Sequence, residues 1–396
     1  MSAQPAGPAP DFDPLDEAFA ANPHPTWARL RRECPVARGA VWDFWALTRY
    51  EDIKRASRSP KSFTSSEGVT VPRNPVSGRR APLHFDPPEH PLYRRPLNTV
   101  LSEAHIAELE PRIAALAAKL VAKLVAQGSS DAVAQLSSPL AGVTLGMLIG
   151  LDEAEALDLN KHSERFEWAQ GHRQVDVAEA ENLYLYGRCR EIVEARSRAP
   201  ADPARDIVSA LLSTRVGGQP LDHEFIAGSL RQLLIAAHVA PTAALASAIR
   251  HLACDHVLQD RLRSEPARIA EAVEEFLRLY TPNQGFARTA TRATTIRGRL
   301  IRPGEQVALV LTSANRDEEI FPEPDAFILG RSPNPHIAFG HGAHKCPGRQ
   351  LARAEMRLGL EKLLGATDYF QLADEPRWLR WPLYGPESLP LACQAS

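Results

Sequence analysis

The longest apolar segment of this chain, residues 222–254, restricts the possible folds more than any other part of the sequence. At 1.5 Å per residue, a helix of this length is a rod of roughly 50 Å, long enough to cross a whole domain. Its residues are apolar on most sides, and a helix that is hydrophobic all round should be buried. The segment therefore predicts a long central helix surrounded by other elements.

Pro241 lies in the interior of this predicted helix. Proline has no backbone N–H, so the carbonyl group of Ala237 loses its partner and the helix is expected to kink. Two interpretations stay open. The kink is either a tolerated irregularity in a core helix or a groove opened beside a ligand.

Helical spacing also dominates the rest of the middle of the chain. Apolar residues recur at helical intervals over 103–127, and Gly128 stands where that helix would end. Further helices are expected at 132–149, 152–169, 176–197, 204–213, 266–279 and 347–365. Strands are expected at 42–48, 294–300, 306–311 and near the end of the chain, with a turn at Pro303-Gly304. The predicted fold class is mainly α with small β-sheets.

The organisation of the chain is expected to be simple. It has no internal repeat, and its only low-complexity block is the Ala- and Pro-rich stretch 1–10, which indicates a disordered leader followed by one domain over 11–396. This stretch has no cationic start or cleavage pattern of a signal peptide. No uninterrupted apolar run reaches the roughly 18 residues needed to cross a bilayer. A cytoplasmic protein is therefore expected.

Charge and cysteine content exclude several classes of partner and site. The 46 basic and 48 acidic side chains give a formal charge of −2, so no electrostatic footprint for nucleic acid or an anionic membrane is present. The five cysteines are odd in number and scattered, which argues against a disulfide framework and against a CxxC-type zinc site. Neither a nucleic-acid nor a membrane partner is expected.

A cysteine-containing loop precedes the predicted helix at 347–365. Pro347 suits the first helical position, because its missing N–H would have no intrahelical partner. Cys346 would then lie at the positive end of the helix dipole, which lowers the pKa of a thiol and favours thiolate. Three glycines within nine residues let the backbone approach a flat ligand closely, and Phe339 can pack on the face of that ligand. The alternative is an ordinary buried thiol in a loop that the glycines merely shape.

The spacing of this loop resembles the haem-binding signature of the cytochrome P450 family. That signature has Phe, Gly, Gly, a basic residue, Cys and Gly at separations that match Phe339, Gly340, Gly342, His344, Cys346 and Gly348. The resemblance covers about residues 11–390. It implies a single-domain cytochrome P450 fold, with haem between the long central helix and the helix that follows the cysteine loop. It also implies haem b as cofactor, with its iron ligated by Cys346.

Two further segments resemble the same family in the expected order. Glu275 and Arg278 look like the family's Glu-x-x-Arg pair, whose spacing puts both charges on one helix face. The family often has an arginine where this chain has Ala326, so a third partner for the pair is unassigned. The segment around Asp86 resembles the start of a helix beside the haem.

The resemblance also implies partners for the haem propionates. They are His90, Arg94, Arg288 and His344. Cationic donors suit carboxylates that would otherwise be buried without a partner. Each of the four is alternatively a surface charge.

The long helix departs from the family pattern. Aligned by its distance to Glu275, the acid-alcohol pair that delivers protons to bound oxygen falls on Val239 and Ala240, neither of which carries a proton. Three substitutes are open: Thr242 or His238 acting through ordered water, a hydroxyl group of the substrate, or hydrogen peroxide as the oxidant. The last would make the protein a peroxygenase.

The regions that line the substrate pocket in the family fall on six residues of this chain: Phe166, Trp168, Ala236, Ala237, Gln284 and Phe286. Aromatic walls suit a small apolar or aromatic ligand, while core packing is the alternative. The proline kink and the segment 385–389 are similar to bacterial members that demethylate methoxyphenols. A terpene, a fatty acid or a biosynthetic intermediate stays open as substrate.

The resemblance implies a haem-thiolate monooxygenase that inserts one oxygen atom from O2 into a small organic substrate, by hydroxylation or O-dealkylation. Its electrons would come from an external ferredoxin with its reductase or from a flavodoxin-type donor, since no flavin-binding or iron-sulfur cysteine pattern is present. A basic patch is a candidate docking surface for such a donor; it consists of Arg94, Arg95, Lys345, Arg349 and Arg353. Other classes stay open: a haem sensor or electron carrier, and an enzyme in which Cys346 is a free nucleophile.

Overall fold

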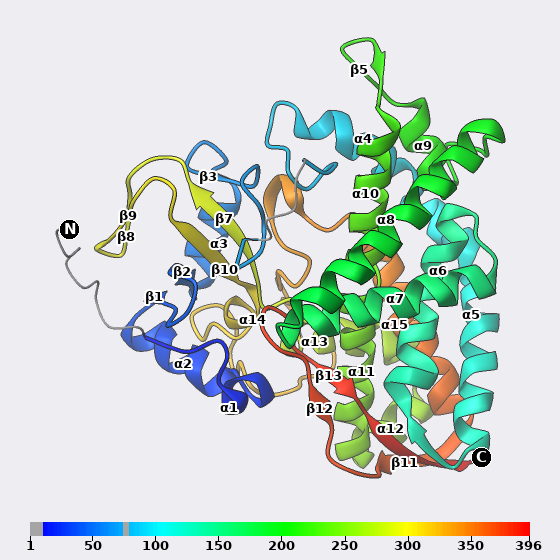
Figure 1. The fold of residues 1–396 in the computed structure, drawn as a ribbon. Coiled ribbons are helices and arrows are strands. Elements are labelled where there is room, and N and C mark those ends of the chain that lie inside the picture. Colours follow the sequence, from blue (N-terminus) through cyan, green and yellow to red (C-terminus); the bar gives the residue numbers. More distant parts are fainter. Residues whose placement is uncertain (1–10, 74–78) are drawn as a thin grey trace.

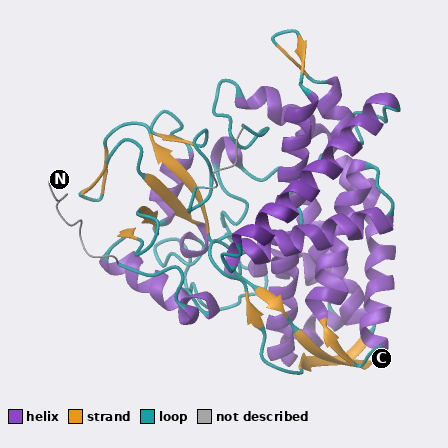
Figure 2. Ribbon diagram, viewed as in Figure 1, coloured by secondary structure: helices purple, strands orange, loops and turns teal. Residues whose placement is uncertain are grey.

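The computed structural model describes residues 11–73 and 79–396. Helices fill most of the molecule, and a smaller part built around a β-sheet lies beside them (Figures 1 and 2). This arrangement confirms the expected fold class, mainly α with small sheets. The leader expected at 1–10 lies outside the described residues.

The large helical part contains the long helices of the chain. In chain order they are α4 (His90–Val100), α5 (Glu103–Ala126), α6 (Ser138–Ile149), α7 (Glu153–Gly171), α8 (Val175–Arg198), α9 (Ile207–Ser213), α10 (His223–Ala236), α11 (Val239–Cys254), α12 (His256–Ser264), α13 (Ile269–Leu279) and α15 (Arg349–Gly365). A π-helical turn, Val133–Ser137, leads into α6, and a 3-10 turn, Pro266–Arg268, leads into α13. Each helix expected from the periodicity is present, with ends that differ by a few residues.

Helix α5 shows why the periodic segments become helices. The side chain of Ser102 accepts a hydrogen bond from the N–H of His105 and so satisfies a backbone donor of the first turn. Residues at helical spacing, among them Ile113 and Leu116, are buried against the rest of the core. The helix ends at Ala126, and Gly128 adopts a left-handed φ of +67° just beyond it.

A five-stranded sheet organises the smaller part. Its order is β1 (Val36–Arg38), β2 (Phe44–Leu47), β10 (Gln306–Val310), β7 (Gly285–Ala290) and β3 (Phe63–Thr64). Strand β10 is parallel to β2 and antiparallel to β7. The short helices α1 (Glu17–Ala21), α2 (His24–Glu33), α3 (Tyr50–Ser57) and α14 (Leu311–Ala314) belong to this region of the chain (Figure 1).

The segment expected as one strand at 294–300 is a hairpin instead. Its strands are β8 (Thr294–Ile296) and β9 (Arg299–Ile301). Arg297 and Gly298 join them with φ values of +46° and +78°. Two successive residues with positive φ match the type of tight turn whose twist suits a two-residue hairpin. The turn therefore divides a run whose composition alone indicated a single strand.

The remaining strands form small sheets, two of which lie near the chain end. One joins β11 (Thr367–Leu372), β14 (Pro390–Ala395) and β4 (Ser129–Asp131). Another pairs β12 (Arg377–Trp378) with β13 (Pro386–Ser388), and β5 (Arg215–Val216) pairs with β6 (Gln219–Pro220). The strands expected near the end of the sequence are thus confirmed.

Buried apolar side chains form one large cluster within the helical part and two smaller ones on the five-stranded sheet. On β2, Trp45 and Leu47 belong to one of the sheet clusters, while Phe44 and Ala46 belong to the other. This division follows from the alternation of side chains along a strand. Both faces of β2 are therefore covered.

The long apolar segment is two helices rather than one. Helix α10 ends at Ala236 and α11 begins at Val239, so the break lies at residues 237–238. Over the run His223–Cys254 the segment is long and apolar enough for a membrane span, but 67% of its most apolar window is buried inside the protein. The core position of the two helices accounts for their hydropathy.

The break precedes the proline expected to cause it. The N–H of Thr242 donates to the carbonyl oxygen of His238 at 3.1 Å, so α11 starts its own hydrogen-bond ladder after the break. Pro241 consequently lies in the first turn of α11, where a missing N–H costs little. The kink predicted at Pro241 is thus a full interruption at Ala237 and His238.

Candidate functional site

The cysteine loop is folded by its own backbone hydrogen bonds. The N–H of Cys346 donates to the carbonyl oxygen of Phe339, and the N–H of Gly340 donates to that of Ile337, both at 2.8 Å. Helix α15 begins only at Arg349, with Gly348 as its N-cap. The prediction that Pro347 occupies the first helical position is therefore wrong, because the closed loop extends past it.

The thiol of Cys346 is less acidic than its position suggested. The residue is half-buried, and desolvation raises the pKa of the thiol. A backbone hydrogen bond from Gly348 and the positive charges of Arg94, Arg349 and Arg353 act in the opposite direction, but burial outweighs them. The expected lowering of this pKa by the helix end is thus wrong for the protein alone. Coordination of the sulfur to a metal cation would favour the thiolate.

Two glycines give the loop a shape that other residues would not. Gly340 and Gly342 have φ values of +72° and +75°. A Cβ atom at Gly342 would lie 2.6 Å from the carbonyl oxygen of Ser57 at the end of α3, well inside contact distance. At Gly348 the corresponding position is 4.0 Å from the sulfur of Cys346. The first two glycines shape the loop, and the third leaves room beside the sulfur.

Four basic side chains from separate parts of the chain lie close to this loop. His90 and Arg94 are one turn apart on α4, Arg288 is on β7, and His344 belongs to the loop itself. The rings of His90 and His344 are 4.5 Å apart. Arg94 donates through Nη2 to the carbonyl oxygen of Lys345 and through Nε to Asn98 at 2.8 Å. His90, Arg94 and Arg288 are each less than a tenth exposed.

Protein acceptors satisfy only part of this cationic cluster. Oδ1 of Asp86 lies 3.5 Å from Nε2 of His344. Although burial would raise it, hydrogen bonds from His344, Thr64 and Ser65 hold the pKa of Asp86 well below its usual range. Within the described part of the chain, Nε2 of His90 has no hydrogen-bond partner. Asp86 thus balances one of the cations and leaves the others without an acid.

The environment of the other cations disfavours positive charge. Burial, with the neighbouring charges of His344 and Arg94, lowers the pKa of His90 to about 4. Burial lowers the pKa of Arg288 to about 10. Two carboxylates beside these groups would relieve both effects. The cationic cluster therefore fits the two propionates of a haem, and the glycine-shaped loop beside Cys346 fits its flat macrocycle.

The break in the central helix presents polar groups without partners. His238 is 3% exposed, and its Nε2 lies 3.2 Å from Oγ of Ser138 and 3.7 Å from Oε1 of Glu164. Among residues 11–73 and 79–396, neither Nδ1 of His238 nor the hydroxyl of Thr242 has a hydrogen-bond partner. Val239 and Ala240 contribute no polar side chain.

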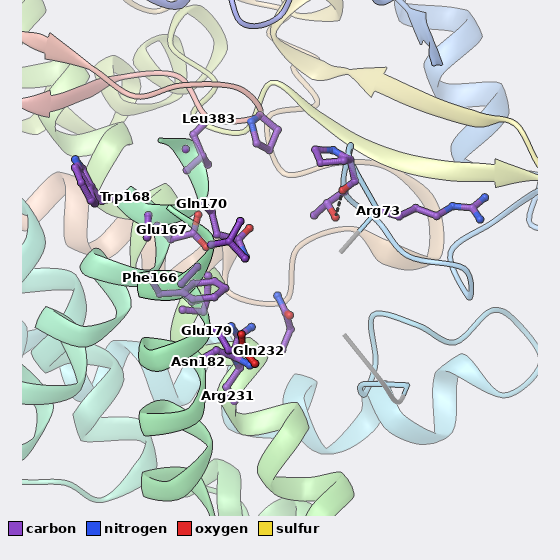
Figure 3. Close-up of a pocket in the computed structure, with 18 of the residues that line it drawn as sticks. Arg73, Phe166, Glu167, Trp168, Gln170, Glu179, Asn182, Arg231, Gln232 and Leu383 are labelled. Atoms are coloured by element: carbon purple, nitrogen blue, oxygen red, sulfur yellow. Dashed lines mark hydrogen bonds between the residues drawn. The ribbon is translucent and has the colours of Figure 1, made fainter. Parts of the chain in front are cut away.

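A cavity of about 1360 Å³ lies beside α7, α8 and α10 (Figure 3). Phe166 and Trp168, which the sequence suggested for the substrate pocket, both line it. Phe166 is buried, whereas Trp168 is 46% exposed and stacks on His172. The wall continues along α10 to Ile235, two residues before the break begins at Ala237.

The other residues suggested for the pocket lie elsewhere. Ala236, Ala237, Gln284 and Phe286 are not in the wall of this cavity. The side chain of Gln284 accepts from the indole of Trp27 at 3.2 Å and donates to a backbone carbonyl at 2.9 Å, so it holds two parts of the fold together. Phe286 packs on one cluster of the five-stranded sheet.

Sequence reasoning missed two buried arginines in the cavity wall, Arg231 and Arg80. Arg231 carried a signal, because a charged residue inside a segment that is apolar on most sides must find a partner or face a cavity. Arg80 lies in a loop and carried no such signal. Arg231 nevertheless lies 4.2 Å from the ring centre of Phe166, one of the residues that the family resemblance did suggest.

The buried ion pair has a third member that the sequence left unassigned. Arg278 donates to both carboxylate oxygens of Glu275, at 2.9 and 2.7 Å. Arg331 donates through Nε to the same carboxylate at 2.9 Å. It lies five residues after Ala326, and its side chain is 6% exposed. Arg331 therefore supplies the second guanidinium for Glu275.

Comparisons with known proteins agree with this geometry. A model described as Cytochrome P450 matches residues 184–373. Cytochrome P450 109 of Bacillus spizizenii is 30% identical over 353 residues, which are 87% of this chain and 84% of that protein. Linalool 8-monooxygenase of Pseudomonas putida is 31% identical, over 94% of this chain and 95% of that protein.

Solved structures show the same likeness in three dimensions. The cytochrome P450 CYP109Q5 of Chondromyces apiculatus has a TM-score of 0.87 at 27% identity and covers 97% of this chain and 98% of its own. CYP268A2 of Mycobacterium marinum, solved in complex with pseudoionone, has a TM-score of 0.88 at 27% identity and covers 99% of this chain and 100% of its own. The chain therefore belongs to the cytochrome P450 family of haem-dependent monooxygenases, with haem b as its cofactor.

Proposed function

We propose that this protein inserts one oxygen atom from O2 into a small organic substrate held in the cavity beside α10, by hydroxylation or O-dealkylation. The observation that carries the proposal is the position of the cavity. Its wall follows α10 to Ile235, next to the break that holds unpartnered polar groups. A cavity of this size for an organic ligand argues against a haem sensor or a simple electron carrier.

We propose that Cys346 ligates the haem iron, with Phe339, Gly340 and Gly348 around the macrocycle. His90, Arg94, Arg288 and His344 would hold the propionates. The first three are buried and form no ion pair within the described part of the chain, while His344 contacts Asp86. When bound, haem supplies O2 binding and O–O cleavage, which electron donation from the thiolate favours. The protein positions the substrate, excludes water and delivers protons.

The first experiment is the spectrum of the reduced protein with carbon monoxide. We expect the absorption band of thiolate-ligated haem, and we expect Cys346→Ser to lose it. A purified protein with no Soret band would contradict haem binding and restore Cys346 as a candidate free nucleophile. A screen for compounds that displace the iron-bound water would then narrow the substrate. Methoxyphenols, terpenes and fatty acids belong in that screen.

Proton delivery is proposed to use water at the break between α10 and α11. The hydroxyl of Thr242 and Nδ1 of His238 are buried and unpartnered within the described ranges, so each is available to a water molecule. On its other side, His238 contacts Ser138 and Glu164, whose side chain is 44% exposed. Through these contacts His238 connects the partly exposed carboxylate of Glu164 to the break. A hydroxyl group of the substrate would supplement this connection.

The coupling of electron use to product formation tests this relay. We expect His238→Ala and Thr242→Ala together to lower the product formed per reductant consumed, because bound oxygen would be released before it is protonated. Ser247→Ala is a control that removes a buried hydroxyl from the same helix, α11, and leaves His238 and Thr242 in place. Unchanged coupling in the double variant would contradict a relay through protein side chains.

Peroxide use is a second candidate, favoured by the absence of a proton-carrying side chain at Val239 and Ala240. Hydrogen peroxide brings both oxygen atoms and protons, so the usual acid-alcohol pair is not needed. Turnover with peroxide that is steady and faster than turnover with reductase and O2 would identify a peroxygenase. Faster turnover with reductase would support the monooxygenase.

Electrons are proposed to come from an external ferredoxin with its reductase or from a flavodoxin-type donor. Of the expected basic patch, Arg95 and Lys345 are exposed, while Arg353 is paired with Glu274 at 2.6 Å and Arg94 is buried. An acidic donor would therefore meet Arg95 and Lys345 first. We expect charge reversal at both to slow reduction by such a donor and to weaken its salt dependence. An unchanged rate would contradict this docking site.

We further propose that residues 11–396 form a single haem domain in the cytoplasm. The similarity of solved cytochrome P450 chains over nearly the whole length supports one domain. The burial of the apolar run His223–Cys254 supports the location. Limited proteolysis that releases a folded fragment, or recovery of the protein with membranes, would contradict these two points.

A further inference from the structure

Arg231 is a buried cation with unused hydrogen-bond donors. It lies on α10 in the cavity wall and is 2% exposed. Its guanidinium is 4.2 Å from the ring centre of Phe166. Within the part of the chain that the structure describes, Nε and Nη2 have no hydrogen-bond partner. Unpaired buried charge of this kind is costly and calls for an anion.

A second arginine faces the same cavity. Arg80 is 3% exposed, and its Nη2 donates to the hydroxyl of Tyr186 at 2.5 Å. Its Nε has no partner among residues 11–73 and 79–396. The guanidinium groups of Arg80 and Arg231 lie 5.8 and 5.9 Å from the ring centre of Tyr186. The two cations thus flank one aromatic side chain.

The acidic side chains near them do not neutralise the pair. Glu167 lines the cavity and feels the charge of Arg231, but within the described ranges it forms no ion pair with Arg231 or Arg80. Burial raises the pKa of Glu167 to about 7, although Arg231 acts to lower it. At the rim, by contrast, Arg190 is paired with Glu224 at 2.7 Å. Arg73 and Arg173 in the wall also have no acidic partner among the described residues, but both are exposed to water. Arg231 and Arg80 are the buried cations of this wall that are left without an acid.

We propose that the cavity binds an organic acid whose carboxylate is held by Arg231 and Arg80 and whose apolar body lies along α10 toward the break. Guanidinium groups bind carboxylates through paired, charge-assisted hydrogen bonds. Phe166, Phe85 and Ile235 provide apolar wall for the body of the ligand. This inference rests on the proposed function, because it names the class of substrate that the oxygenase takes.

The geometry also limits where the acid is oxidised. From Arg231 to Ala236, where α10 ends at the break, the helix advances five residues, which is about 7.5 Å at 1.5 Å per residue. A carboxylate anchored at Arg231 therefore keeps the first carbons of the chain away from the break. The reacting carbon is expected to lie about this distance from the carboxylate, in a flexible acid of medium length.

Calorimetric titration of the haem-loaded protein tests the inference without turnover. The probes are decanoate and 1-decanol, which share a chain and differ in charge. We expect Arg231→Gln and Arg80→Gln each to weaken binding of decanoate about 10- to 100-fold, the range for a lost charge-assisted hydrogen bond. Binding of 1-decanol should stay unchanged. Arg190→Gln, at the rim, is the matched control and should leave both affinities as they are.

Several outcomes would overturn the inference. One is equal affinity of the natural protein for decanoate and 1-decanol. Another is a decanoate affinity that neither Arg231→Gln nor Arg80→Gln changes. A third is a loss of decanoate affinity in Arg190→Gln as large as the loss in those two variants. Decyl sulfate as a third probe separates the acid classes: tighter binding than decanoate would overturn the carboxylate assignment. If Arg231→Gln does not fold, Arg231→Lys, which keeps the charge, should retain the preference for decanoate, and Arg80→Gln should still lose it.

The results also separate this inference from the proposed function. Decanoate that binds through Arg231 but gives no oxygenated product under any oxidant would contradict the monooxygenase and leave the acid site in place. Oxygenation of neutral compounds, with no binding of decanoate, would contradict the acid site alone.

Discussion

Removing Arg278 should destabilise the fold more than removing any exposed arginine. This side chain is fully buried. Besides the two bonds to Glu275, it donates to the backbone carbonyl oxygens of Asn315, Pro324 and Ala326, at 3.0, 2.6 and 2.9 Å. In Arg278→Leu each of these three carbonyls and both oxygens of a buried carboxylate lose one donor, although Arg331 still donates to Ala326 and to Glu275. Removing one partner of a buried ion pair costs about 3–5 kcal/mol of unfolding free energy, and we expect a value of about 4 kcal/mol.

Three further variants apportion this loss. Arg331→Leu leaves Glu275 with both bonds from Arg278, so its cost should be smaller, about 1–3 kcal/mol. The double variant Glu275→Leu with Arg278→Leu should cost less than the sum of its single changes, because each single change already breaks the same pair. Arg331 loses its acid in the double variant as it does in Glu275→Leu. The exposed control is Arg261→Leu, whose pair with Glu265 has side chains 49% and 46% exposed. It should change the free energy by at most about 0.5 kcal/mol.

Urea unfolding of the haem-loaded proteins at pH 7, followed by far-UV circular dichroism, measures these differences. The Soret absorbance recorded in the same titration reports whether haem leaves before the helices unfold. A cost for Arg278→Leu no larger than that for Arg261→Leu would refute the reasoning. A double variant as costly as the sum would show that Glu275 and Arg278 are not coupled, and would contradict the pair as the source of the loss.

Three further predictions concern the loop and two buried acids. Gly342→Ala should lower haem content per protein in absorbance measurements, since the new methyl group meets a carbonyl oxygen at 2.6 Å, whereas Gly187→Ala, with open space around it, should not. Both carboxylate oxygens of Glu355 are buried without a partner in the described chain, and burial raises its pKa well above the ordinary 4.5. Ionising Glu355 costs stability, so the urea midpoint of the natural protein should fall as pH rises above about 5. Glu355→Gln should remove this dependence of the midpoint on pH. Equal slopes of midpoint against pH in the two proteins would contradict the role of Glu355. Burial raises the pKa of Glu167 to about 7, so its charge above that pH should compete for Arg231 and weaken decanoate binding. In calorimetry, Glu167→Gln should bind decanoate equally below and above about pH 7.

The pH effect on decanoate binding depends on the other groups that face Arg231. They are Arg80 on the neighbouring loop and Tyr186 and Cys189 on α8. Burial raises the pKa of Cys189 to about 12, so this thiol stays neutral in the same range. Glu167 is therefore the acid whose ionisation changes the charge of this site near neutral pH. A persisting pH dependence in Glu167→Gln would contradict that assignment.

Local chemistry determined much of what the sequence predicted. The helices follow from apolar periodicity, because one buried stripe needs the same 3.6-residue spacing wherever the helix packs. The glycine and cysteine spacing of the loop is equally local, since Gly340 and Gly342 need a left-handed φ that the sequence marks directly. The interruption of the central helix was foreseen from Pro241, but its position was not. The hydrogen-bond ladder, and not the proline itself, decides where the helix restarts.

Other features depend on residues that meet only in the folded chain. Arg331 reaches Glu275 because the segment after α14 passes over α13, which no spacing rule specifies. The pKa of Cys346 is raised because the folded chain removes the thiol from water, an effect that outweighs the helix end. Arg231 and Arg80 are more than a hundred residues apart and become one site only when α10 and the loop before α4 meet. By itself the sequence determined the helices, the cysteine loop and the family, since these follow from short-range pattern. Only the tertiary structure decided which charges stay unpaired, because burial and long-range contact set the cost of each charge.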